Sequence, residues 1–116
     1  MVGLFGAAGA LSRYAIGTWV GATSFPWATL GINVAGSFLL GLVLVAGPIK
    51  LDADLTTAIG IGFLGAFTTF STFSSETQTM LREDRLAAAA AYVTVSVVAG
   101  IAAAALGYVI GKALVD

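Results

Sequence analysis

The chain has 116 residues, of which 59% are hydrophobic and 9% charged, and its formal net charge is −1. Because a soluble domain carries about 25% charged residues, this composition predicts an integral membrane protein with one domain, residues 1–116. The weak net charge argues against nucleic-acid binding, and the absence of cysteine and histidine excludes disulfides, thiolate metal sites and imidazole acid–base chemistry.

Four apolar segments follow one another along the chain, each close to the ~20 residues that cross a bilayer as a helix. Their approximate limits are residues 2–22, 27–46, 55–81 and 86–114. The sequence therefore predicts an all-α fold with four transmembrane helices. Gly47 and Pro48 are expected to end the second helix, because proline disrupts a helix interior.

The first segment contains Arg13. No basic residue precedes the apolar run, so it does not have the pattern of a cleaved signal peptide. An arginine at this depth is expected to face an aqueous vestibule, where it would attract anions. The alternatives are that Arg13 snorkels to the interface or pairs with a carboxylate.

The second segment places Thr29, Asn33, Ser37 and Gly41 at four-residue spacing, on one helix face. Asn33 lies near mid-membrane, so its amide must find hydrogen-bond partners inside the bundle. It either lines a wet path or joins neighbouring helices, which is a common use of asparagine in membranes.

The third segment becomes polar halfway along. Ten residues between Ala66 and Met80 carry a hydroxyl, amide or carboxyl group, and lipid would not tolerate them. We expect a break at residues 65–69, because glycines precede it and the two threonines within it are β-branched, with modest helix propensity. Its freed carbonyls would suit a cation; the alternative is an unbroken helix with hydroxyls bonded back to the backbone. Glu76 either belongs to this polar track or reaches the interface.

Phe70 and Phe73 lie on one face of the third segment, among serines and threonines. An aromatic ring is positive at its edge, so rings presented edge-on would pass an anion without a formal charge to trap it. The alternative is ordinary core packing. Tyr92 and Ser96 form a third polar stripe on the fourth segment, and stripes on three helices favour one shared wet path.

Charge placement says little about orientation. Lys50 and Lys112 flank the spans on the side of the termini, whereas Arg82 and Arg85 flank them on the other side. This balance removes the bias of the positive-inside rule and predicts a dual-topology protein whose working unit is an antiparallel pair; the alternative is one weakly fixed orientation.

The sequence contains no nucleophile–base pair, metal-ligand cluster or phosphate loop, so we do not expect an enzyme.

Motifs in all four segments together resemble the Fluc (CrcB) family of fluoride channels. The matching stretches are Gly6-Ala7-Ala8-Gly9-Ala10 with Arg13-Tyr14, Thr29-Leu30 with Asn33, Gly36-Ser37-Phe38 and Gly41, Gly62-Phe63-Leu64-Gly65 with Thr68-Thr69-Phe70-Ser71-Thr72-Phe73, and Tyr92 with Ser96 and Gly100. The resemblance covers nearly the whole chain, and the third stretch is the most specific.

The resemblance implies an antiparallel, dual-topology homodimer with two fluoride pores, or a heterodimer with a related chain. It implies these pore residues: Phe70 and Phe73 as paired rings, Asn33, Tyr92 and Ser96 along the same conduit, Ser71 and Thr72 as a polar track, Glu76 near one end, and Arg13 in the vestibule. It further implies a structural sodium ion at the dimer interface, held by the backbone carbonyls of Gly65 and Thr68 from both subunits.

The resemblance implies passive, selective export of cytoplasmic fluoride across the plasma (inner) membrane of a prokaryote, with the protein in contact with the lipid bilayer. The alternative from another class is a small dual-topology, proton-coupled multidrug exporter. That class needs a titratable carboxylate within the bundle, and the first segment offers only Arg13. A non-conducting assembly subunit is the third reading.

Overall fold

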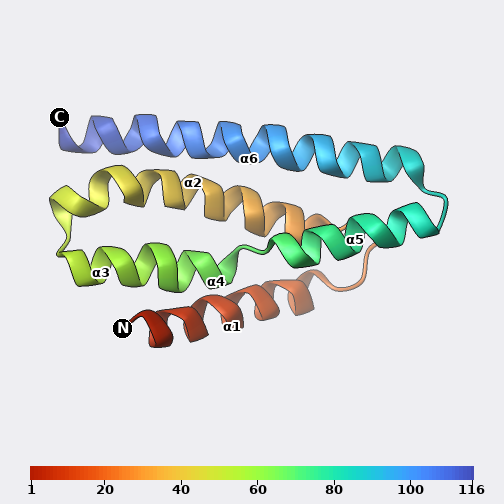
Figure 1. The fold of residues 1–116 in the computed structure, drawn as a ribbon, viewed down its shortest axis with the longest axis horizontal. Helices are drawn as coiled ribbons and strands as arrows, with labels where there is room; N and C mark the ends of the chain where they lie inside the picture. Colours follow the sequence, from red (N-terminus) through yellow and green to blue (C-terminus); the bar gives the residue numbers. More distant parts are fainter.

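The computed structural model describes all of residues 1–116, and every regular element in it is a helix (Figure 1). In chain order the elements are α1 (Val2–Val20), α2 (Trp27–Lys50), α3 (Ala53–Thr57), η1 (Ala58–Leu64, a π-helix), α4 (Gly65–Phe67), α5 (Phe70–Arg82) and α6 (Leu86–Val115). The helices run along the long axis of the molecule, and both termini lie at the same end (Figure 1). The all-α prediction is confirmed.

Three segments are long and apolar enough to cross a membrane: Trp27–Lys50, the interrupted helix Ala53–Arg82, and Leu86–Val115. They correspond to the second, third and fourth predicted spans. α1 has 19 residues and is not among these three, because Arg13 and several glycines lower its hydropathy.

The expected end of the second helix at Gly47-Pro48 is wrong. α2 continues through Pro48 to Lys50. Proline costs most in a helix interior, where it removes a hydrogen bond and its ring crowds the preceding turn. Here it stands in the last turn, where the Leu51 N–H still closes on the Gly47 carbonyl at 2.8 Å.

The third span is interrupted, but over fewer residues than 65–69. Gly65 is helical (φ −62°, ψ −37°), whereas Thr68 (φ −82°, ψ 157°) and Thr69 (φ −152°, ψ 122°) are extended. Figure 1 shows the ribbon straighten between α4 and α5 at this point. The β-branched threonines, which favour extended backbone, therefore form the break, and the glycines precede it within wide or regular helix.

The most extensive helix–helix packing is between α2 and α6. The two backbones meet at glycines: a Cβ on Gly41 would overlap the Ala104 carbonyl, and one on Gly107 would overlap the Phe38 carbonyl. Near the loop between α5 and α6, a small core of Leu30, Met80, Ala89 and Tyr92 joins α2, α5 and α6. These contacts hold α5 and α6 at fixed positions beside α2.

α1 packs on the other side of the interrupted helix, mainly against η1 and α4. Gly9 is buried against the backbone of Phe63. This close approach places Arg13, one turn further along α1, beside the carboxyl end of α4.

Candidate functional site

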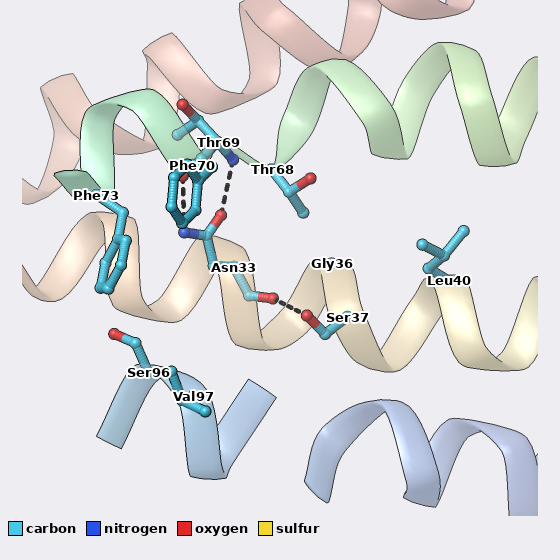
Figure 2. Close-up of a pocket in the computed structure, with 10 residues that line it drawn as sticks. All are labelled: Asn33, Gly36, Ser37, Leu40, Thr68, Thr69, Phe70, Phe73, Ser96 and Val97. Carbon is cyan, nitrogen blue, oxygen red and sulfur yellow. Dashed lines mark hydrogen bonds between the residues drawn. The ribbon is translucent and has the colours of Figure 1, made fainter. Parts of the chain in front are cut away.

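The break in the third span is held by Asn33 of α2. Its Nδ2 donates to the Thr69 carbonyl at 3.0 Å, and its Oδ1 accepts from the Thr69 N–H at 2.8 Å. Figure 2 shows both bonds side by side, with the Asn33 amide facing the extended backbone. One side chain thus satisfies both backbone groups of a residue that has left the helix, as a buried backbone requires.

Threonine hydroxyls cap the two half-helices. The Thr69 hydroxyl accepts from the Thr72 N–H at 3.2 Å and so caps α5, while the Thr68 hydroxyl donates back to the Leu64 carbonyl at 3.0 Å. The carbonyl oxygens of Gly65 and Thr68 accept no hydrogen bond within the chain. The break therefore leaves these two oxygens free.

A first cavity of about 300 Å³ opens beside the break, between α2, α5 and α6. Its lining residues are Asn33, Gly36, Ser37, Leu40, Thr68, Thr69, Phe70, Phe73, Ser96 and Val97. The Phe70 and Phe73 rings are tilted by 46° with their centroids 5.8 Å apart. No lining residue carries a formal charge.

Ser96 completes this cavity from α6. Its hydroxyl oxygen is the one buried side-chain polar atom in the chain that has no hydrogen-bond partner, and Figure 2 shows it directed toward Phe73, across the cavity from α2. A buried hydroxyl without a partner carries a desolvation cost, which a polar occupant of the cavity would remove.

A second cavity, of about 540 Å³, lies between α1, α2 and α5. It shares Thr69 with the first cavity and includes Arg13, Thr72 and Glu76. Arg13 does not pair with a carboxylate, since the chain's one ion pair joins Arg85 and Glu83. Its Nε instead donates to the carbonyl of Ala66 at 3.2 Å.

Glu76 is held by two hydroxyl donors. Tyr92 donates to one carboxylate oxygen at 3.0 Å, and Thr29 donates to the other at 3.1 Å. The Tyr92 side chain is fully buried, and its ring packs 5.0 Å from that of Phe73. Tyr92 thus lies behind the cavity wall and connects the aromatic pair to the carboxylate.

A third cavity of about 380 Å³ lies near the loops that join α1 to α2 and α5 to α6. It shares Thr23 and Glu76 with the second cavity and includes Ser75, Thr79 and Arg85. Polar hollows therefore follow α5 from the break to its carboxyl end.

The site residues expected from the sequence fall into three groups. Asn33, Phe70, Phe73, Ser96 and Thr68 meet at the first cavity, and Arg13, Thr72 and Glu76 meet at the second. Gly65, Ser71 and Tyr92 line none of these hollows: Gly65 and Ser71 are exposed, and Tyr92, expected along the conduit, is fully buried behind Phe73.

Two contacts were not foreseen from the sequence. They are the Thr29 hydroxyl bond to Glu76 and the Arg13 bond to a backbone carbonyl. The four-residue spacing of Thr29 and Asn33 was the available signal for the first. No sequence pattern reports the second, because its acceptor is main chain.

Comparison with known proteins gives a consistent result. The family model described as "CrcB-like protein, Camphor Resistance (CrcB)" matches residues 1–108. A Thermus thermophilus protein named "Fluoride-specific ion channel FluC" is 43% identical over 99% of this chain and 94% of its own length. "Fluoride-specific ion channel FluC 2" of Moorella thermoacetica is 41% identical over 97% of this chain and 95% of its own. "Fluoride-specific ion channel FluC 2" of Listeria innocua is 42% identical over 86% and 79%. The chain belongs to the CrcB family.

Proposed function

We propose that this chain forms a passive, highly selective channel through which cytoplasmic fluoride leaves the cell. The observation that carries the proposal is the match of relatives named fluoride-specific ion channels over nearly the whole chain, at 41% and 43% identity. The apolar helices and the bacterial relatives indicate a multi-pass protein of the prokaryotic plasma membrane. The multidrug-exporter alternative is not favoured, because the relatives bear the channel name.

The chemistry of the first cavity supports an anion pathway. Fluoride is small and strongly hydrated, so a selective path must replace its water shell with donors. The Ser96 hydroxyl, which has no partner, and the edges of Phe70 and Phe73 offer positive character without a formal charge. Such a site binds the anion weakly enough to release it.

The direction of the α5 helix dipole also supports an anion pathway. α5 begins at Phe70, at the break; the Thr69 hydroxyl accepts from the Thr72 N–H, whereas the N–H groups of Phe70 and Ser71 have no partner in a preceding turn. The amino end of a helix carries partial positive charge and favours anions. We propose Ser71 and Thr72, at the start of this helix, as the polar track, which the hydroxyls of Ser75 and Thr79 continue past Glu76.

Exposure on one side of the chain supports an antiparallel homodimer. Phe70 is 79% exposed, and Ser71, Ser75 and Gln78 are exposed on the same half-helix. Lipid is a poor environment for such a face, so a second copy is needed to enclose the pathway. The balance of Lys50 and Lys112 against Arg82 and Arg85 favours insertion in both orientations.

The free carbonyls at the break fit a hard cation. Sodium prefers oxygen ligands, and broken transmembrane helices offer carbonyls for this purpose. Gly65 and Thr68 supply one such set per chain, and two copies facing each other would double it. In this proposal the ion neutralises the carbonyl ends of the half-helices and is not transported.

The proposal is tested by fluoride efflux from liposomes that contain the purified protein, followed with a fluoride electrode. We expect fast fluoride release without a proton gradient, while chloride is retained in parallel vesicles. A folded dimer that releases neither ion, or that requires a proton gradient, would overturn the proposal.

A further inference from the structure

The contact between Arg13 and the carboxyl end of α4 has a role that the channel proposal does not assign. Ala66 lies in the last turn before the break, and in an uninterrupted helix its carbonyl would accept the N–H four residues further on. Because the backbone is extended at Thr68 and Thr69, that partner is lost. The Arg13 Nε–H, 3.2 Å away, replaces it from another helix.

We infer that Arg13 is a positioning residue for the break. Its Nε–H fixes the Ala66 carbonyl, and through the connected backbone it fixes the free carbonyls of Gly65, in the adjacent peptide unit, and of Thr68, two units further on. The bond also removes the Ala66 oxygen from the oxygens that remain available to a cation. The rest of the guanidinium lines the second cavity, so one side chain supplies both a structural donor and a vestibule charge.

Three substitutions separate these two roles. In glutamine the amide nitrogen stands at the chain position of the arginine Nε, so Arg13→Gln keeps a donor there and removes the charge. In lysine that position is a methylene, so Arg13→Lys keeps the charge and removes the donor. Arg13→Met keeps neither and retains comparable apolar bulk.

The experiment measures amide hydrogen exchange over residues 64–72 in purified wild type and in each variant, together with fluoride efflux from liposomes. Loss of one hydrogen bond is expected to speed exchange in this segment by about tenfold in Arg13→Lys and Arg13→Met. Arg13→Gln is expected to exchange like the wild type. Exchange in the Gly107 region of α6 is the internal control, and we expect it to stay unchanged in all variants.

The efflux readout rests on the proposed channel function, whereas the exchange readout does not. We expect Arg13→Gln to retain more flux than Arg13→Met, which shares its lack of charge.

Two outcomes would contradict the inference. If Arg13→Lys conducts and exchanges like the wild type while Arg13→Gln behaves like Arg13→Met, Arg13 acts through charge alone and the inference is wrong. Equal exchange in all four proteins would also overturn it. The expected exchange pattern in a protein that conducts no fluoride would uphold the inference and remove the channel proposal.

Discussion

Asn33 has two functions at the residue scale, because the amide that lines the first cavity also completes the backbone of Thr69. Replacing it with alanine leaves one N–H and one carbonyl without partners inside the bundle. Each unsatisfied group costs about 1–3 kcal/mol. We therefore expect Asn33→Ala to lower the free energy of unfolding by about 2–6 kcal/mol and to reduce fluoride flux.

The measurement for Asn33 is the thermal unfolding midpoint in detergent, with flux as the second readout. Ser37→Ala is the matched control, because Ser37 shares the helix and the cavity and its hydroxyl bonds only to the Asn33 carbonyl in the turn before it. We expect that control to change stability by less than about 1 kcal/mol. An Asn33→Ala protein as stable as the control would show that water replaces the amide.

The phenylalanine pair provides the second residue-scale prediction. Edge-to-face contacts between two aromatic rings contribute about 0.5–1.5 kcal/mol each. If each ring edge contacts the anion on the same scale, removing two rings raises the barrier by about 1–3 kcal/mol and slows flux by roughly fivefold to a hundredfold. We expect this from Phe70→Ile with Phe73→Ile, measured as initial fluoride efflux, with the dimer intact by size-exclusion chromatography.

Phe63→Ile is the control for the ring substitutions. Phe63 stacks on Phe67, with ring centroids 5.7 Å apart, and lines neither the first nor the second cavity. Its loss should leave efflux near the wild-type rate. A doubly substituted dimer that conducts like this control would contradict the aromatic mechanism and leave packing as the role of the rings.

At the element scale, the pairing of α2 with α6 depends on close backbone approach. A Cβ on Gly41 would overlap the Ala104 carbonyl, which is main chain and cannot rotate away. We expect Gly41→Ala to push the helices apart and to cost about 1–3 kcal/mol, as overpacking does. Gly31→Ala on the same helix meets no atom within 4 Å and should stabilise the helix by up to about 1 kcal/mol. Thermal unfolding of both variants measures the difference, and equal midpoints would contradict it.

The break shows how far sequence reasoning reaches at this scale. The glycines that precede the break and the β-branched Thr68 and Thr69 predicted an interruption, and one is present. Its narrow extent, and the π-helix η1 before it, were not predicted. Glycine permits several backbone conformations, and which of them forms is decided by packing against α1 that the sequence does not display.

The end of α2 and the lining of the first cavity show the same limit of prediction from the sequence. The sequence predicts that Gly47-Pro48 ends α2, but α2 continues to Lys50, because a proline in the final turn costs little. Conversely, polar stripes on three helices predict one shared path. Asn33, Phe70, Phe73 and Ser96 line one cavity, whereas Tyr92, from the same stripe as Ser96, lies behind its wall. Side-chain periodicity is readable in a sequence, whereas main-chain acceptors such as the Ala66 carbonyl are not.

At the scale of the whole molecule, the exposed polar face of α5 and the balanced flanking charges both favour an antiparallel dimer. If both orientations are needed to build an antiparallel dimer, a chain forced into one orientation should fail alone. Ala53 and Asp116 lie at the end with the termini, and Glu83 and Leu86 lie at the other end; all four are exposed. Lysines at either pair should bias that end toward the cytoplasm.

We therefore expect the Ala53→Lys, Asp116→Lys chain and the Glu83→Lys, Leu86→Lys chain each to lose most fluoride efflux when expressed alone. Co-expression of the two should restore it, because each then supplies the orientation that the other lacks. Neutral glutamine substitutions at the same positions are the matched controls and should conduct like the wild type.

The orientation of each chain is measured separately. Since the chain has no cysteine, a single Ser24→Cys reporter labels with an impermeant maleimide according to orientation alone. The reporter should label from both faces of the membrane in the wild type and from one face in each biased chain. A biased chain that labels from one face and still conducts fully would show that a parallel pair or a monomer suffices, and the antiparallel proposal would fall.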